Sequence, residues 1–299
     1  MLTFTNSHLL LGELDYVEPA SVDEACALLA EHAGEARLLA GGTDLLVQLK
    51  LERAEARCLI GMRRLPELRR ITGEDGLVLG AAATIRSIAR SALVRGRYAA
   101  LQEACEAFST LQVMVMGTVG GNVCNASPAA DTVPALLAFD ARAGLRGRHG
   151  ERAVPLDELF VGPGRTVLHA DEMLESLRLA PVSAGTGSAF LKLGRVAADI
   201  AKVSVAVRLD REGEHIRDCR VALGAVAPTP VRSGEAERAL RGQAPSAALV
   251  QDAARAAADE IRPITDVRST AAYRRHAAGV LVQDAIRRAW ARAGGREIR

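Results

Sequence analysis

The sequence predicts an α+β fold in two parts. In the first 180 or so residues, segments with helical spacing of apolar residues alternate with short apolar strand segments, a pattern typical of a sheet covered by helices. After a stretch rich in Gly, Ser and Thr at residues 181–187, strands follow one another and helices close the chain, which indicates a separate α+β domain. With 299 residues, 49% of them hydrophobic, the chain can bury a large core.

The first predicted helix begins at the sequence Ser21-Val-Asp-Glu24, which has the form of a capping box. The Ser21 hydroxyl can accept the backbone N–H of Glu24, whose side chain can reach back to the cap. Apolar residues then recur at helical spacing, and Gly34 is placed to end the helix. These apolar residues are Val22, Ala25, Leu28 and Leu29. We therefore expect about three turns of helix before the first strand.

The remaining elements follow from apolar periodicity and from capping residues. In the first part, strands are predicted at residues 37–40, 57–60, 77–83 and 175–179, and helices at residues 85–93, with Thr84 as cap, and 101–115. A further apolar helix is expected to start at Asp131 with Pro134 in its first turn. In the second part, strands are predicted at residues 189–193, 203–209 and 216–226, and helices at residues 234–240, 247–261 and 269–293.

Composition excludes several classes of function. The 38 basic and 36 acidic residues are interspersed, so no long-range field gathers nucleic acid or an anionic membrane. Aromatic residues make up only 3%, too few for base-stacking platforms. No stretch approaches the ~18 apolar residues of a membrane span, and residues 1–16 lack the pattern of a signal peptide. We expect a cytoplasmic protein without a membrane span and without nucleic acid as a partner.

Cysteine and histidine spacing predicts no metal site in this chain. The five cysteines are far apart and form no C-x-x-C pair, which argues against a disulfide framework and against an iron–sulfur or zinc site. The six histidines show neither H-x-x-x-H nor H-E-x-x-H spacing. We interpret the cysteines as small buried apolar residues.

Two glycine-rich segments are the strongest functional signal. They are LLAGGTDLLVQLK at residues 38–50 and MGTVGGNVCNASPAADTVPALLAFDA at residues 116–141. Each one alone most simply indicates a turn that needs positive φ. Together they share glycines beside small hydroxyl or amide residues, and such loops can present several backbone N–H groups to one pyrophosphate. The Rossmann G-x-G-x-x-G pattern is absent, since Val119 stands where its second glycine would be, and no P-loop or G-x-S-x-G motif occurs.

These segments resemble the FAD-binding medium subunit of the molybdenum hydroxylases, which include the xanthine dehydrogenase, carbon monoxide dehydrogenase and 4-hydroxybenzoyl-CoA reductase families. FLKLGRVAADIAKVSVAV at residues 190–207 and LGAVAPTPVRSGEAE at residues 223–237 extend the resemblance, down to ITDVRSTAAYRRHAAGVLV at residues 264–282. It implies an FAD-binding domain of the PCMH (vanillyl-alcohol oxidase-like) type at residues 1–180, with α/β lobes of about 1–56 and 57–180. A C-terminal α+β domain of the CO dehydrogenase flavoprotein type, with a small three-stranded antiparallel sheet and helices, would follow at residues 181–299.

The resemblance also implies a cofactor site. It places Leu39, Ala40, Gly41, Gly42, Thr43, Asp44 and Leu45 in a first pyrophosphate loop, and Thr118, Gly120, Gly121 and Asn122 in a second one. Gly41 and Gly42 are then expected to lack side chains because cofactor phosphates need that space. Asn125 and Asp131 would bind the nucleotide half, the carboxylate accepting from sugar hydroxyls, while Leu174 would pack near the adenine.

Lys192 is expected near the isoalloxazine ring, where its ammonium would stabilise the negative charge of reduced flavin. On the residues alone, Lys192 can also be a solvated side chain at a strand end, and Asp131 a carboxylate at a helix start. Some family members have a Tyr at the position of Ile200, so the ring environment differs here. No residue near the first loop is a candidate for covalent flavin attachment, so FAD is expected to be non-covalent.

The function implied by the resemblance is electron transfer. Substrate would be oxidised at a molybdopterin centre in a large partner subunit, and electrons would pass through two [2Fe–2S] clusters of a small partner subunit to FAD in this chain. FAD would reduce NAD, quinone or oxygen, and the assembly would be a dimer of heterotrimers. This chain would itself contain no catalytic residue and no metal.

Two other functions remain open on the sequence. The first is a stand-alone flavin reductase or oxidase resembling the UDP-N-acetylenolpyruvoylglucosamine reductases, which would be active as a lone monomer. The second is a non-catalytic assembly subunit that kept the fold and lost the cofactor. The intact glycines and Asp131 argue against the second, because a scaffold has no need of loops without side chains.

Overall fold

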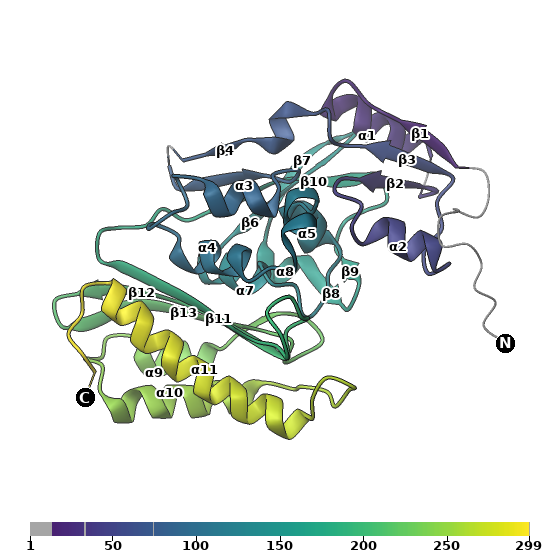
Figure 1. Ribbon diagram of the computed structural model, residues 1–299. Coiled ribbons are helices and arrows are strands. Elements are labelled where there is room, and N and C mark those ends of the chain that lie inside the picture. Colours follow the sequence, from purple (N-terminus) through teal and green to yellow (C-terminus); the bar gives the residue numbers. More distant parts are fainter. Residues whose placement is uncertain (1–13, 33, 74, 299) are drawn as a thin grey trace.

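The computed structural model describes residues 14–32, 34–73 and 75–298. Residues 1–13, part of the stretch where we expected no signal peptide, lie outside the described residues. The predicted α+β fold is confirmed: an upper part with two sheets and several short helices rests on a lower antiparallel sheet, and three helices cover the far side of that sheet (Figure 1). Of the helices in the described part of the chain, none has the length and apolar character needed to cross a membrane.

The first sheet is parallel and has three strands. Its bounds, in the spatial order β1-β3-β2, are Asp15–Val17, Cys58–Gly61 and Ala36–Leu39, and the helices beside it are α1 (Val22–Glu31) and α2 (Leu45–Lys50). Ser21 caps α1 by accepting the N–H of Glu24 at 3.1 Å. The Glu24 carboxylate accepts from the N–H of Ala20 at 2.6 Å, one residue before the predicted partner. Strand β3 lies beyond residue 56, so this sheet takes in residues from both sides of the proposed lobe boundary.

The second sheet is antiparallel and forms the centre of the upper part. Its five strands, in the order β4-β5-β10-β6-β7, are Ile71–Thr72, Leu77–Gly80, Glu172–Leu179, Arg142–Gly147 and Gly150–Pro155. The hairpin β6–β7 was not predicted, because most of its residues are partly or fully exposed and arginine and glycine interrupt the apolar pattern. Three small elements lie outside the sheets' main strands: a 3-10 turn at Pro66–Arg69 and the pair β8 (Phe160–Gly162) and β9 (Arg165–Thr166).

Six short helices complete the upper part: α3 (Ile85–Arg90), α4 (Ala99–Glu106), α5 (Leu111–Met116), α6 (Val119–Cys124), α7 (Val133–Ala138) and α8 (Leu156–Leu159). The single helix predicted at residues 101–115 is wrong. Ser109 has a positive φ of 32°, and Thr110 starts a new helix by accepting the N–H of Val113. Ser and Thr favour such caps over helix interiors, which is the signal that the apolar pattern concealed. Helix α6, inside the second glycine segment, was also not predicted.

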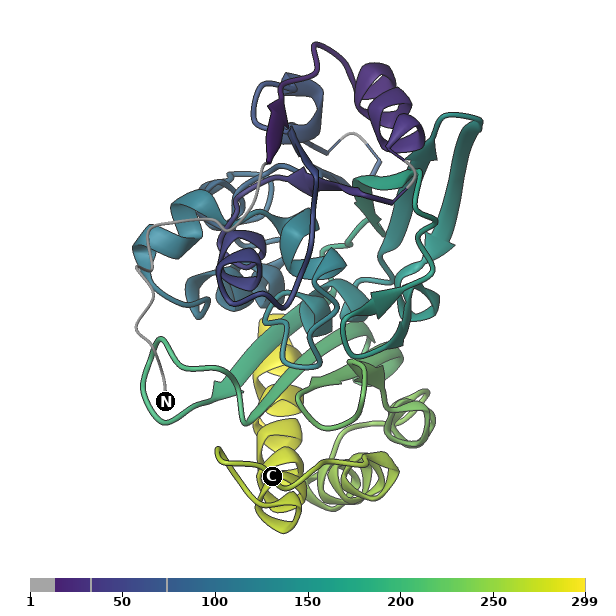
Figure 2. The same ribbon diagram turned by 90° about the vertical axis from the view of Figure 1, so that its right-hand side faces the viewer.

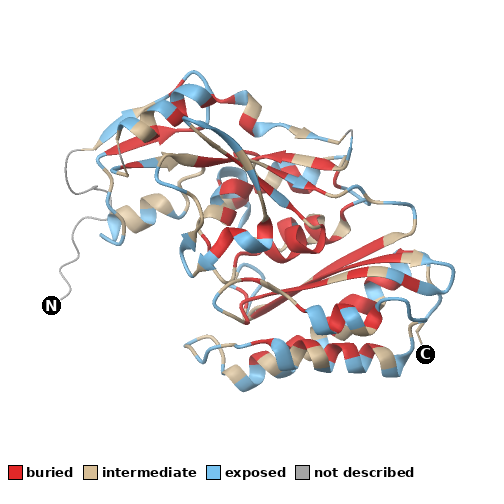
Figure 3. Cartoon of the chain, turned by 180° about the vertical axis from the view of Figure 1, so that it is seen from behind, coloured by how far each residue is buried: buried red, intermediate tan, exposed pale blue. Residues whose placement is uncertain are grey.

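The lower sheet separates two cores. Its strands are β11 (Thr186–Leu193), β12 (Val203–Glu212), β13 (His215–Gly224) and β14 (Val231–Arg232), so the sheet has four strands rather than the expected three. One face, with Phe190 and Ala206, packs into the core of the upper part. The other face, with Val205 and Val221, packs against the C-terminal helices, and both views show the sheet between these layers (Figures 2 and 3). These helices are α9 (Gly234–Leu240), α10 (Ala247–Glu260) and α11 (Ala271–Arg292).

Candidate functional site

The two glycine segments meet in space and form one wall of a cavity. A Cβ atom on Gly41 would lie 2.2 Å from the carbonyl oxygen of Met116 and 2.9 Å from Cα of Gly117, so the two loops are in direct backbone contact. The cavity beside this contact has a volume of about 460 Å³, within the range of small-molecule sites. Eleven of the predicted site residues line it: Ala40, Gly41, Gly42, Thr43, Asp44, Leu45, Thr118, Gly121, Asn122, Asn125 and Leu174.

Four predicted site residues do not line this cavity: Leu39, Gly120, Asp131 and Lys192. Leu39 ends strand β2 just before the loop. Gly120 lies on a smaller apolar recess behind the loops and packs against Ala81, whose carbonyl oxygen would be 2.6 Å from an added Cβ. Asp131 and Lys192 lie together at the contact between the upper part and the lower sheet.

The structure gives the glycines a different reason from the expected one. Gly41 lacks a side chain because the backbone of the second loop occupies that place. Gly42 has φ +72°, the left-handed conformation that glycine adopts without steric cost, and an added Cβ would also meet Leu46 Cδ1 at 3.0 Å. Gly121 differs, since an added Cβ there would approach only Thr118 Oγ1, at 3.0 Å, within 4 Å.

The first loop presents open backbone donors. Within the described part of the chain, the N–H groups of the five consecutive residues Gly41 to Leu45 donate to no protein acceptor, and the next N–H, of Leu46, donates to Gly42 O at 3.1 Å. Consecutive free N–H groups around a left-handed residue form an anion-binding concavity. Asp44 contributes a carboxylate to the same cavity, and burial raises the pKa of that carboxyl.

The second loop has used its backbone donors within the protein. Val119 N–H donates to Ala83 O at 3.0 Å, Gly120 N–H to Ala81 O at 2.9 Å, Gly121 N–H to Thr118 Oγ1 at 3.0 Å and Asn122 N–H to Thr118 O at 3.0 Å. The first two bonds fasten helix α6 to the turn that follows β5, and the other two cap the helix at Thr118. The expectation that both loops offer bare amides is therefore wrong for the second one.

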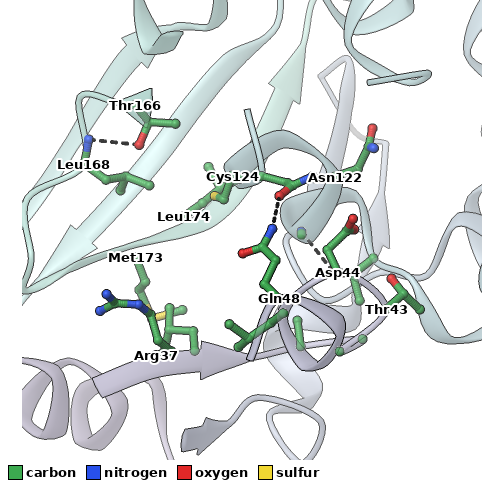
Figure 4. Close-up of a pocket in the computed structure, with 18 of the residues that line it drawn as sticks. Arg37, Thr43, Asp44, Gln48, Asn122, Cys124, Thr166, Leu168, Met173 and Leu174 are labelled. Atoms are coloured by element: carbon green, nitrogen blue, oxygen red, sulfur yellow. Dashed lines mark hydrogen bonds between the residues drawn. The ribbon is translucent and has the colours of Figure 1, made fainter. Parts of the chain in front are cut away.

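Side chains take the place of those amides in the second loop. Asn122 Oδ1 accepts from the hydroxyl of Thr132 at 2.7 Å, and Asn125 Oδ1 accepts from Gln48 Nε2 at 3.2 Å. In both bonds the amide oxygen is the acceptor, which leaves the NH₂ group of each asparagine as a donor. Figure 4 shows Gln48 reaching from α2 toward the second loop. The Thr118 hydroxyl, which accepts from Gly121, keeps its own hydrogen to donate.

Several lining residues were not predicted from the sequence. Around Leu174 the cavity is lined by Arg37, Leu38, Thr166, Leu168, His169, Glu172 and Met173, and Figure 4 labels Arg37, Thr166, Leu168 and Met173 among them. Arg152 donates two hydrogen bonds of 2.7 Å to Glu172 and holds the pKa of this carboxyl at about 2. Another unpredicted lining residue, Phe108, belongs to the break between α4 and α5. A helix boundary placed at Ser109-Thr110 would have put Phe108 in a loop, where a residue can reach the cavity.

Asp131 and Lys192 form a buried ion pair with an Nζ–Oδ2 distance of 2.8 Å, and Lys192 also donates to Ala107 O at 3.1 Å. The Lys192 side chain is only 5% exposed, and burial raises the pKa of Asp131 to about 6 although Lys192 opposes this. Asp131 Oδ1 is buried without a hydrogen-bond partner among the described residues. Because the two side chains touch, they cannot serve opposite ends of one extended ligand, and the assignment of Asp131 to the nucleotide half is incompatible with that of Lys192 to the ring.

Cys124 also lines the cavity, which the sequence did not predict. Burial raises the pKa of its thiol to about 12, so the thiol stays protonated at neutral pH. Covalent attachment of a flavin needs the thiolate. In the described part of the chain, no three His, Cys, Asp or Glu side chains gather in a way that could hold a metal ion.

Comparison with known proteins agrees with this geometry. Residues 12–181 match the family described as the FAD binding domain in molybdopterin dehydrogenase, and residues 188–289 match the CO dehydrogenase flavoprotein C-terminal domain. The chain is 37% identical over 279 residues to the carbon monoxide dehydrogenase medium chain of Hydrogenophaga pseudoflava, covering 93% of this chain and 97% of that one. It is 30% identical over 285 residues to the xanthine dehydrogenase FAD-binding subunit of Escherichia coli O157:H7, covering 94% and 97%.

A solved structure of the Hydrogenophaga pseudoflava carbon monoxide dehydrogenase, in a form lacking the Mo-pyranopterin moiety of its molybdenum cofactor, superimposes with a TM-score of 0.91. The two chains are 38% identical, and the match covers 94% of this chain and 98% of that one. Two matching domains in the same order and near-complete coverage of both relatives confirm the resemblance seen in the sequence. The chain belongs to the FAD-binding medium subunits of the molybdopterin-dependent hydroxylases.

Proposed function

We propose that the 460 Å³ cavity holds FAD and that the chain transfers electrons from [2Fe–2S] clusters of a partner subunit to an acceptor, which is NAD, quinone or oxygen. One observation carries the proposal: five consecutive residues, Gly41 to Leu45, line the cavity and have backbone N–H groups without a protein acceptor among the described residues. An anionic diphosphate satisfies several such donors at once, without a cluster of Lys or Arg.

The remaining polar groups of the cavity fit the same ligand. The Thr118 hydroxyl and the NH₂ groups of Asn122 and Asn125 supply further donors from the second loop, which adjoins the first. Asp44 is better suited to accept from ribityl or ribose hydroxyls than to face the phosphates, because two negative groups repel at close range. The high pKa of the Cys124 thiol supports non-covalent binding.

The cavity also suggests which end holds the ring. Lys192 donates to Ala107 O, and the next residue, Phe108, lines the cavity, so the Asp131–Lys192 pair adjoins the Phe108 end. We assign the isoalloxazine ring to this end and the adenine to the end with Leu174. Bound FAD supplies reversible redox chemistry. Lys192 would contribute positive charge from behind this end of the cavity, which neither its side chain nor that of Asp131 lines.

The assembly is part of the same proposal. The relatives are a medium chain and an FAD-binding subunit, which implies partner chains. We expect a large subunit with molybdopterin and a small one with two [2Fe–2S] clusters, in a cytoplasmic dimer of heterotrimers. No observation favours the stand-alone reductase or the assembly protein over this arrangement.

Ligand titration of the flavin-free chain tests the site. We expect FAD to bind far more tightly than FMN or riboflavin, and ADP to displace FAD, because the open amides hold the diphosphate. Flavin fluorescence follows the titration. Equal affinity for riboflavin and FAD would rule out the loop assignment. Purification of the native complex, with iron and molybdenum content measured, separates an electron-transfer subunit from a stand-alone enzyme.

A further inference from the structure

Lys192 is placed by residues from both parts of the molecule. It lies on β11 of the lower sheet, whereas its partners Asp131 and Ala107 belong to the upper part. Any shift of β11 relative to α4 therefore moves the ammonium away from both partners. The contacts between α4 and β11 decide where this charge sits.

These contacts form a ladder with three rungs. Ala100 N–H donates to Ser188 Oγ at 3.1 Å, Phe190 N–H donates to Glu103 Oε2 at 2.8 Å, and Lys192 Nζ donates to Ala107 O at 3.1 Å. Along β11 each rung is two residues from the next, and along α4 it is three or four. Two strand residues span roughly 6.6 Å and four helical residues roughly 6 Å, so helix and strand stay in register over all three rungs.

Glu103 is the charged rung of this ladder. Besides Phe190 N–H, its carboxylate accepts from Arg292 of α11, with Nη2–Oε1 and Nη1–Oε2 distances of 2.6 and 3.0 Å. Arg292 in turn donates to Ser188 O at 2.7 Å. Hydrogen bonds with charged partners are about twice as strong as neutral ones. One carboxylate therefore ties α4 to both β11 and α11.

We propose that Glu103 is a positioning residue for Lys192: it holds β11 in register on α4 so that the ammonium two residues further along the strand meets Asp131 and Ala107 O. The consequence for the cofactor rests on the proposed function, in which the ammonium of Lys192 adds positive charge near the flavin ring. The register itself is a property of the chain without its cofactor and can be measured in that state.

Asp140 provides a matched control. It also joins the two parts, accepting from Arg208 at 3.4 Å, Arg220 at 2.8 Å and Arg232 at 3.0 Å. These arginines lie on β12, β13 and β14, so the Asp140→Asn variant weakens the contact between the same two parts without touching the α4–β11 ladder.

Lysine acetylation of the flavin-free chain, quantified by mass spectrometry, reads out the register. The sequence has only three lysines, Lys50, Lys192 and Lys202, so each site is followed separately. A buried lysine reacts through local opening, and removing the Glu103 bonds makes that opening easier. In Glu103→Ala we expect the acetylation rate of Lys192 to rise on the order of tenfold, with Lys50 and Lys202 unchanged. In Asp140→Asn we expect the rate of Lys192 to stay at the wild-type value.

A second variant covers the case in which Glu103→Ala fails to fold. Glu103→Gln keeps an oxygen for the Phe190 N–H but loses the charge that pairs with Arg292, so a smaller increase at Lys192 is expected. An unchanged Lys192 rate in a folded Glu103 variant, or an equal rise in Asp140→Asn, overturns the proposal.

The flavin-loaded chain adds a second readout. A Lys192 that has left its place stabilises reduced flavin less, so the midpoint potential of bound FAD should fall in Glu103→Ala and not in Asp140→Asn. If acetylation rises while the potential stays constant, the positioning of Lys192 stands and its proposed place beside the ring is refuted. Failure of the wild-type chain to bind FAD would refute the proposed function and leave the acetylation result intact.

Discussion

The two glycine loops have similar sequences and differ in what they offer a ligand. Among the residues that the structure describes, no acceptor pairs with the backbone N–H groups of Gly41-Gly42-Thr43-Asp44, whereas every N–H from Val119 to Asn122 is bonded within the protein. The first loop lies between strand β2 and helix α2, where none of the described residues places an acceptor on its N–H groups. The second loop is bonded to the turn after β5. The first therefore offers its backbone and the second its side chains.

This difference teaches that glycine content does not by itself reveal a ligand contact. Gly41 and Gly120 are glycines because protein backbone lies against them, at 2.2 and 2.6 Å from an added Cβ. Gly42 is a glycine because of its φ of +72°. The cavity is suited to an anion because the backbone N–H groups of Gly41 to Leu45 have no acceptor among the described residues.

The largest effect is expected for Gly41→Ala, which places a Cβ on the backbone of Met116 and separates the two loops. We expect a loss of roughly 3 kcal/mol in the free energy of unfolding, at the upper end for overpacking, and loss of FAD retention. Urea denaturation and flavin content measure both. The control is Gly279→Ala on α11, where an added Cβ meets nothing closer than 3.8 Å and helix propensity predicts a gain of up to ~1 kcal/mol. A Gly41→Ala chain with normal stability and flavin would contradict the contact between the loops.

Gly42→Ala sharpens the comparison, because it disturbs the open loop without separating the two segments. The left-handed φ costs about 1–2 kcal/mol for alanine, and relaxation of the loop should weaken FAD binding. Gly96→Ala is the matched control: Gly96 has φ +75°, and an added Cβ would meet nothing within 4 Å. We expect the two variants to lose comparable stability in urea denaturation and only Gly42→Ala to lose FAD affinity by fluorescence titration. Equal FAD affinity in both would count against the first loop as the anion site.

The smallest effect is expected for Thr118→Val, which tests the side-chain donors of the second loop. The variant loses the cap that accepts Gly121 N–H, at a cost of about 1 kcal/mol, and one donor to the ligand, worth roughly fivefold to tenfold in FAD affinity. Thr270→Val removes a comparable cap, from α11, and should leave FAD affinity unchanged. If both variants bind FAD like wild type, the Thr118 hydroxyl makes no contact with the cofactor.

Local elements were largely predictable where the signal lies within a few residues. The caps at Ser21 and Thr84 accept the N–H groups that their spacing predicts, and helix α9 has the predicted bounds. The break at Ser109 was missed because apolar residues continue across it at helical spacing. The hairpin β6–β7 was missed because its pairing with β10, not its own apolar pattern, stabilises it.

The site was predictable as a set of residues and not as a geometry. Most of the predicted loop residues line the cavity, since chain order alone brings neighbours together. The pairing of Asp131 with Lys192, the place of Cys124 in the cavity wall and the end formed by Leu168 and Met173 depend on segments that are distant in sequence. No short pattern encodes such contacts.

The amino-acid sequence was sufficient to identify the family, the local elements with clear periodicity and caps, and the two loops of small residues. Only the tertiary structure decided which loop keeps its N–H groups free and where Lys192 is held. The physical reason is that a backbone N–H is open or bonded according to the acceptors placed around it. For α6 those acceptors include the carbonyls of Ala81 and Ala83, and for β11 the partner is Glu103, all brought in from elsewhere in the chain.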